Sequence, residues 1–249
     1  MGAREYRVRG AHERTRSASA APGGRLTVSF AELTDVGHRR QVNDDAIVSA
    51  PAAGGLLFAV ADGVSGLPGA RRASQTALGS FIGALAGVAD RKPMHKRLRA
   101  AAERANLDVH DQARGDPALR SMRTTLTATA IVGDALAAVH VGDCRLYLLR
   151  HARLECLTRD HRSLWQHHVL TRCLGADPIV RVDVVRKRLQ YGDVLLQCSD
   201  GLYNAVSAPR IAMVLASEPP AAACHTLARL ARAGVGGDDV SVQVALLHA

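Results

Sequence analysis

Hydrophobic and polar residues follow two different rhythms along the chain, and the change of rhythm predicts where strands and helices lie. Short apolar runs bounded by glycine, proline or aspartate are typical of strands. They occur at 26–33, 46–49, 56–61, 126–132, 136–141, 145–150, 153–157, 180–189, 194–198 and 240–247. Apolar residues spaced four apart instead predict helices at 70–89 and 95–114, and one or two more between 209 and 232.

The order of these elements favours one fold class. Strands, a pair of helices, more strands, helices and a last strand do not alternate as strand–helix–strand units, which argues against a doubly wound parallel sheet. Short breaks at Gly133-Asp134 and Gly142-Asp143 predict that 126–157 forms a meander of neighbouring antiparallel strands. We therefore expect a layered antiparallel α+β fold.

Length and composition predict one folded domain behind a basic leader. The 249 residues are 47% hydrophobic, enough to bury one substantial core. Residues 1–24 are rich in Arg, Ser, Ala and Gly, which predicts a disordered tail and leaves 25–249 as the folded domain. No apolar run reaches the roughly 18 residues needed for a membrane span, so we expect a cytoplasmic protein.

The number and spacing of the cysteines, together with the net charge, narrow the range of possible functions. The five cysteines form no CxxC pair, and this favours reduced core thiols over disulfides or zinc. The net charge of +9 is compatible with nucleic-acid binding, but aromatic residues make up only 3% and no nucleic-acid motif is present. No nucleic-acid partner is expected; a basic surface also favours encounters with acidic, phosphorylated protein segments.

Acidic residues gather at the predicted ends of strands. Asp62, Asp143 and Asp200 each end an apolar run beside a glycine, and any one of them alone would indicate only a turn. Two more acidic clusters border strands, at 43–45 and 238–239. If folding brings these ends to one edge, the crowded carboxylates need cations to offset their repulsion.

The oxygen-rich character of this constellation points to a hydrolase for phosphate esters. Carboxylates are hard ligands, which select Mg²⁺, Mn²⁺ or Ca²⁺ over zinc. Two such ions about 3.5–4 Å apart, bridged by one aspartate, lower the pKa of a shared water and bind phosphate oxygens. Because glycine has no side chain, a glycine beside each acid lets a metal ion approach the backbone closely. A backbone carbonyl, such as that of Gly63, can then act as a metal ligand.

In order and spacing, these segments resemble the type 2C serine/threonine protein phosphatases, the metal-dependent PPM family, in their bacterial form. The resemblance runs from about residue 26 to the C-terminus. The segments that carry it are Arg40 with Asn43-Asp44-Asp45-Ala46, Val60-Ala61-Asp62-Gly63, Thr124-Thr125, Gly142-Asp143-Cys144-Arg145, Leu157-Thr158-Arg159-Asp160-His161, Leu170-Thr171-Arg172-Cys173-Leu174-Gly175, Ser199-Asp200-Gly201 and Asp238-Asp239-Val240-Ser241.

The resemblance implies a four-layer α-β-β-α sandwich with two Mn²⁺ or Mg²⁺ ions at one edge of two antiparallel sheets. By position, Asp62 would bridge both ions and Gly63 would add its carbonyl, while Asp200 and Asp238 would complete the second ion. The implied reaction is hydrolysis of phosphoserine and phosphothreonine in proteins, through attack on phosphorus by a hydroxide that bridges the metals.

The resemblance also implies roles for the residues that surround the two metal ions. Asp45 would hold metal-bound waters, and Asp143 would join Asp200 in a third, weaker metal site. Arg40 would grip the substrate phosphate through paired hydrogen bonds. Arg40, Asp62 and Asp200 are thus the predicted catalytic residues. His161 is interpreted as structural.

The chain departs from the family pattern most clearly after Asp160-His161. The family inserts a flap of some tens of residues there, whereas here only 162–169 precede Leu170. This predicts an open cleft, a weaker third metal site and altered substrate choice. Val64 stands where eukaryotic members often carry a histidine, and Ser65 replaces a usual glycine.

An alternative from another class stays open: a phosphatase-like module that binds phosphoproteins or kinases with weak turnover or none. The full set of acidic ligands and Arg40 argues for the enzyme. In either case the expected partners are phosphorylated proteins and a cognate Ser/Thr kinase, and a monomer is expected.

Overall fold

The computed structural model describes residues 16–19, 26–52, 55–87, 92–163, 165, 169–234 and 237–248. Eleven strands and five α-helices are assigned within these ranges. The strands are β1 (Arg16–Ser19), β2 (Thr27–Asp35), β3 (Asp45–Ala52), β4 (Gly55–Asp62), β5 (Leu126–Val132), β6 (Ala135–Val141), β7 (Arg145–Arg150), β8 (Arg153–Cys156), β9 (Asp183–Arg188), β10 (Val194–Cys198) and β11 (Val240–His248). The helices are α1 (Ala70–Gly87), α2 (Met94–Gly115), α3 (Asp200–Tyr203), α4 (Ala208–Ser217) and α5 (Pro220–Ala233), with a 3₁₀ turn at Pro117–Leu119.

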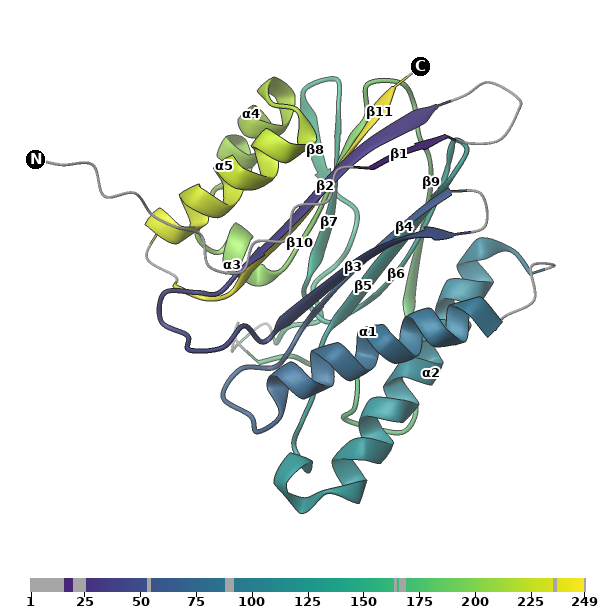
Figure 1. The fold of residues 1–249 in the computed structure, drawn as a ribbon, viewed down its shortest axis with the longest axis vertical. Coiled ribbons are helices and arrows are strands. Elements are labelled where there is room, and N and C mark those ends of the chain that lie inside the picture. The colour runs from purple at the N-terminus through teal and green to yellow at the C-terminus, as the bar shows by residue number, and fades with distance from the viewer. Residues whose placement is uncertain are drawn as a thin grey trace, which may run out of the picture.

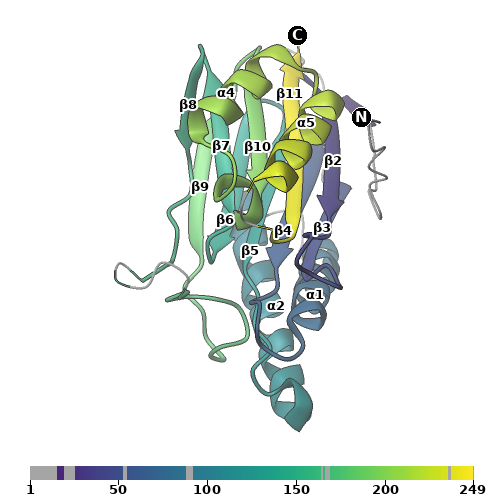
Figure 2. The same ribbon diagram turned by 90° about the vertical axis from the view of Figure 1, so that its left-hand side faces the viewer.

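The strands form two antiparallel sheets that face each other (Figure 1). The first has six strands in the order β1-β2-β11-β10-β7-β8, and the second has five in the order β3-β4-β5-β6-β9. Helices α1 and α2 cover the outer face of the second sheet, while α4 and α5 cover the outer face of the first (Figure 2). The expected α-β-β-α sandwich is confirmed.

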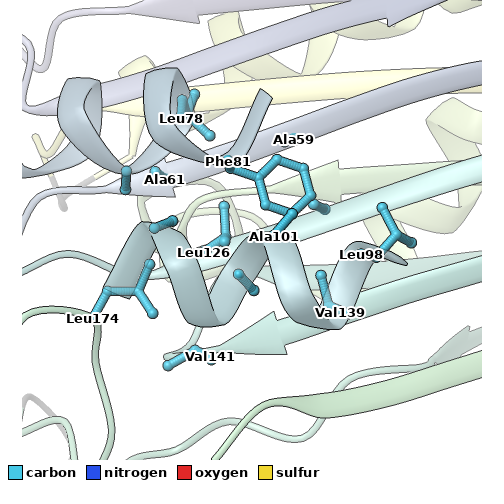
Figure 3. Packing of buried hydrophobic residues seen from close by; sticks show 14 of the residues in the cluster. Ala59, Ala61, Leu78, Phe81, Leu98, Ala101, Leu126, Val139, Val141 and Leu174 are labelled. Atoms are coloured by element: carbon cyan, nitrogen blue, oxygen red, sulfur yellow. The ribbon is translucent and has the colours of Figure 1, made fainter. Parts of the chain in front are cut away.

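Apolar side chains fill the three spaces between these four layers. Phe30, Phe58 and Leu195 belong to the cluster between the sheets. Leu227 lies in the cluster under α4 and α5. Phe81 of α1 belongs to the cluster between the two helices α1 and α2 and the second sheet, where small residues on the helices let them approach the sheet closely (Figure 3). The burial of this apolar area holds the layers together.

The chain between β6 and β7 passes from one sheet to the other, which differs from the meander predicted for 126–157. β5 and β6 pair with each other in the second sheet, whereas β7 and β8 belong to the first. Gly142 makes the crossing with φ +108, and a side chain there would meet Thr125 at 2.5 Å. The glycine that was predicted to mark a short break within one meander is therefore the point at which the two sheets are connected.

The other predicted helices and strands lie within a few residues of the observed ones. Two observed elements had no predicted counterpart. The four-residue α3 was not predicted, and strand β1 lies inside the segment 1–24 that was expected to be disordered. β1 pairs with β2, Arg16 opposite Phe30; the rest of the leader lies outside the described residues. Among the described helices, none is both long and apolar enough to cross a membrane.

Candidate metal centre

The acidic residues singled out in the sequence meet at one edge of the two sheets. In the second sheet, β3 begins and β4 ends at this edge, where Asp45 lies opposite Asp62 in the antiparallel register. In the first sheet, β10 ends and β11 begins there, and Cys198 lies opposite Val242. The antiparallel pairing therefore brings segments far apart in sequence to one place.

Asp45 links the two sheets. Its Oδ2 accepts hydrogen bonds of 2.7 Å from the hydroxyl of Ser199 and of 2.7 Å from that of Ser241, both of the opposite sheet. Burial is the main reason that the pKa of this carboxyl is raised to about 8; the two hydroxyl groups oppose the shift, and the charges of Asp239 and Asp200 add to it. Without a cation, Asp45 is thus a destabilised carboxylate.

Asp62 lies at the centre of the acidic cluster. Its backbone is fixed by Thr124 and Thr125, because Thr125 Oγ1 accepts from the Asp62 N–H at 2.9 Å and Thr124 Oγ1 donates to the Asp62 carbonyl at 2.8 Å. Burial raises the pKa of the Asp62 carboxyl well above its ordinary value, and repulsion from Asp45 and Asp200 adds to the effect.

Gly63 follows Asp62 at a point where no side chain fits. A Cβ there would lie 2.3 Å from the carbonyl oxygen of Ala70 and 2.9 Å from that of Asp44. The Gly63 N–H donates to the Asp44 carbonyl at 3.2 Å. Close backbone packing thus explains the glycine, and the same packing puts its peptide group in the acidic edge.

Asp238 and Asp239 have different partners, although they are neighbours. Asp238 Oδ1 accepts from Arg40 at 3.0 Å (Nε) and 2.8 Å (Nη2). Asp239 uses both carboxylate oxygens to accept from the backbone N–H groups of Gly37, at 2.9 Å, and Asp44, at 2.7 Å. Asp239 therefore fastens the loop that carries Arg40, and Asp238 forms an ion pair with Arg40.

Asp143 and Asp200 are joined by an arginine that the sequence analysis did not single out. Arg162 donates to Asp143 Oδ2 at 2.5 Å through Nε and to Asp200 Oδ2 at 2.8 Å through Nη2. Burial, followed by repulsion from Asp200, raises the pKa of Asp143 to about 6, and Arg162 opposes this shift. The pKa of Asp200 is raised as well, chiefly by burial.

The carboxylate oxygens at this edge are suitable ligands for hard divalent cations. In this structure, however, the carboxylates do not point toward one common position. Within the described ranges, no three His, Cys, Asp or Glu side chains are grouped so that they could hold one metal ion. Two of the expected ligands are turned toward arginines instead, Asp200 toward Arg162 and Asp238 toward Arg40. Buried carboxylates that repel one another fit a bound cation, since positive charge relieves both burial and repulsion.

His161, interpreted from sequence as structural, has structural partners. Its Nδ1 accepts from the Gly142 N–H at 3.0 Å, and its Nε2 lies 3.1 Å from Asp183 and 2.9 Å from Arg172. Burial lowers its pKa, which favours the neutral ring that this acceptor role requires. His161 therefore holds the crossing between the sheets beside the acidic edge.

Sequence reasoning missed the residues that organise the predicted ligands. Arg162 lies in the shortened segment after Asp160-His161, which was interpreted as what remains of the family's flap. The positive charge of Arg162 is the only feature of the sequence that could have drawn attention to it. Ser199 and Ser241 stand inside the quoted segments, yet nothing in the sequence pairs them with Asp45. Side-chain partners across sheets depend on strand pairing, which local patterns do not specify.

A comparison with family models matches residues 36–232 to the family described as protein phosphatase 2C. The chain belongs to this family. Its curated relatives include the serine/threonine protein phosphatase PstP of Mycobacterium tuberculosis, 33% identical over 240 residues. That match covers 88% of this chain but 45% of PstP, so the chain spans about half the length of that relative.

Two further comparisons support the assignment to the protein phosphatase 2C family. Protein phosphatase PhpP of Streptococcus pneumoniae is 29% identical over 239 residues, which cover 87% of this chain and 96% of PhpP. The crystal structure of the PstP catalytic domain in complex with two manganese ions has a TM-score of 0.78 and 33% identity, and the match covers 90% of this chain and all of that one. The family resemblance and the fold stated from sequence are thereby confirmed.

Proposed function

We propose that this chain hydrolyses phosphoserine and phosphothreonine in proteins with the help of two bound Mn²⁺ or Mg²⁺ ions. The observation that carries the proposal is the buried acidic edge, where burial raises the pKa of Asp45, Asp62 and Asp200 and repulsion from neighbouring aspartates adds to each shift. Such crowding is costly in a protein without cations and useful in one that binds them. Membership of the protein phosphatase 2C family and the manganese in the PstP structure support the choice of metal.

In this proposal four groups hold the ions. Asp62 bridges them from the centre of the cluster, the Gly63 carbonyl adds a neutral oxygen, and Asp200 and Asp238 complete the set. Asp45 remains behind them, where its bonds to Ser199 and Ser241 keep its carboxylate oriented. The bound metals would supply Lewis acidity, which activates water and neutralises phosphate charge.

Arg40 is the residue proposed to orient the substrate phosphate. Its guanidinium pairs with Asp238, so it lies beside a proposed metal ligand, and 28% of its side chain is exposed. Although burial opposes it, the ion pair with Asp238 raises the pKa of Arg40, so the group stays positive. A planar guanidinium can donate two parallel hydrogen bonds to phosphate oxygens, which a lysine cannot do.

We also propose where this activity is used. All five cysteines lie within the described ranges and no disulfide joins any two of them, as is typical of a reducing compartment such as the cytoplasm. Proteins phosphorylated by a cognate Ser/Thr kinase would be the substrates, and the chain would act as a monomer.

The deciding experiment is hydrolysis of a phosphothreonine peptide and of p-nitrophenyl phosphate by the purified chain. We expect activity with Mn²⁺ that is lost in EDTA and falls by at least about a hundredfold in Asp200→Asn. The matched control is Asp134→Asn, a substitution in the turn between β5 and β6, far along the strands from the acidic edge. Folded, manganese-loaded protein without activity would instead support the non-catalytic binding module.

A further inference from the structure

Arg162 reaches from the shortened segment after His161 into the acidic edge. Its guanidinium bridges Asp143 and Asp200 with bonds of 2.5 and 2.8 Å, and Nη2 also donates to the Tyr203 hydroxyl at 2.9 Å. Only 16% of the Arg162 side chain is exposed. The contact is therefore enclosed by protein on several sides and differs from a surface ion pair.

The backbone on both sides of Arg162 is fixed by hydrogen bonds. Before it, the His161 N–H donates to the Gly142 carbonyl at 2.8 Å, which ties the segment to the crossing between the sheets. After it, the Ser163 N–H donates to the Val169 carbonyl at 2.8 Å, and Arg162 forms an isolated bridge with Leu170. These bonds fix the backbone at Arg162 so that its side chain is directed toward Asp143.

Tyr203 completes the surroundings of the guanidinium. The Tyr203 hydroxyl accepts from Arg162 and donates to the Asp143 carbonyl at 2.9 Å. The Tyr203 ring lies 5.5 Å from the Arg162 guanidinium and 3.7 Å from that of Arg145, which is itself bound to Asp160. A second arginine and a phenol therefore limit the directions in which Arg162 can swing away.

A metal ion shared by Asp143 and Asp200 would need the place that Arg162 fills. The oxygens available to such an ion include Asp143 Oδ2 and Asp200 Oδ2, which both accept from Arg162. A divalent ion at about 2.0–2.2 Å from these oxygens would lie within a few ångströms of a fixed positive charge. Two cations at that separation repel strongly in a poorly hydrated site.

We propose that the Arg162 guanidinium replaces the third metal ion at the Asp143–Asp200 pair, so that this chain binds two metal ions at the acidic edge and excludes a third. The inference rests on the proposed function, because it takes two-ion binding at Asp62 as given. This inference assigns a role to the shortened segment after His161. The segment supplies the guanidinium of Arg162 as a permanent cation, in the place where a metal ion would otherwise exchange with the solvent. Arg162 thus keeps the negative charge of Asp200 compensated when free metal is scarce.

The test is the number of Mn²⁺ ions bound by the full chain, measured by equilibrium dialysis with elemental analysis and by titration calorimetry. We expect two ions for the wild type. Arg162→Gln removes the charge but keeps a polar side chain, and it should bind a third ion over the same manganese range. Arg159→Gln removes an exposed arginine three residues away and should still bind two.

The number of Mn²⁺ ions bound by Asp143→Asn is a second test, and it does not depend on the stability of Arg162→Gln. If Arg162 occupies the pair, Asp143 is not a metal ligand, and this variant should bind two ions with affinities within about twofold of the wild type. A wild type that binds three ions, with the third lost in Asp143→Asn, overturns the proposal. So does a folded Arg162→Gln that binds only two.

These outcomes separate the inference from the function on which it rests. Failure of the wild type to bind any Mn²⁺ would refute the two-ion phosphatase itself. Two bound ions and phosphatase activity, together with an Arg162→Gln variant that gains no ion, would refute only the role given to Arg162.

Discussion

The hydroxyl of Ser199, at the end of β10, donates a 2.7 Å hydrogen bond to the carboxylate of Asp45, at the start of β3 in the opposite sheet. Ser241, from β11, donates to the same oxygen at the same distance. One carboxylate therefore fastens three strands from two sheets at the acidic edge. Because these groups are buried, the arrangement both stabilises the fold there and sets the position of the proposed metal centre.

Removal of one of these hydroxyls should destabilise the protein. Ser199→Ala leaves a buried carboxylate with one donor fewer, and we expect the free energy of unfolding to fall by about 1–3 kcal/mol. Urea denaturation at pH 7 would measure the change. Ser217→Ala, in an exposed turn of α4, removes a hydroxyl bonded to the Met213 carbonyl and should cost much less. Equal losses in the two variants would contradict the role given to Ser199.

The metal-free protein should lose stability as the pH rises. The pKa values of Asp45, raised to about 8, and Asp143, raised to about 6, both exceed the ordinary value of 3.8. Between about pH 4 and pH 8 the folded state therefore binds more protons than the unfolded state, so the free energy of unfolding falls with increasing pH. Each such group contributes a slope of at most about 1.4 kcal/mol per pH unit within its own window.

Urea unfolding in EDTA at pH 5, 6.5 and 8 measures this slope. Asp45→Asn should flatten the curve across the whole range from about pH 4 to pH 8, whereas Asp143→Asn should flatten it only below about pH 6. Saturating Mn²⁺ should reverse the trend in the wild type, because the metals bind the ionised carboxylates. A metal-free wild type that gains stability from pH 5 to pH 8 would show that other groups dominate.

Gly142 should tolerate no side chain. Gly142→Ala would place a Cβ 2.5 Å from Thr125 Cγ2 at a backbone φ of +108, and we expect the free energy of unfolding to fall by about 1–3 kcal/mol. Gly79→Ala is the matched control: it lies within α1 with open space around it and should stabilise the protein by about 0.5–1 kcal/mol. Thermal unfolding of the pair gives the comparison.

Arg40 should affect the use of substrate more than the fold. Arg40→Ala removes a charged donor from the proposed phosphate position, and kcat/KM for a phosphothreonine peptide should fall about 10- to 150-fold, equivalent to roughly 1.5–3 kcal/mol. Arg40→Lys should recover only part of this, because paired donation is lost. Arg39→Ala changes an exposed neighbour and should leave kcat/KM within about twofold. Equal effects at both arginines would point to general surface charge.

Local sequence patterns were sufficient for the elements and for most of the candidate site. The apolar runs at 126–132, 145–150 and 194–198 match β5, β7 and β10 residue for residue, because buried strands between turn residues leave a clear signal. The aspartates beside glycine were recognisable for the same reason: they stand where a strand must stop. Their order along the chain then identified the family.

The partners of these elements were decided only by the tertiary structure. Alternation along a strand records which face is buried but not which strand lies beside it, so the crossing at Gly142 from one sheet to the other was read as a meander. The bonds of Ser199 to Asp45 and of Arg162 to Asp143 and Asp200 join residues from different sheets and loops. Such contacts depend on how long-range packing places whole strands, and that information is not contained in any short segment of the sequence.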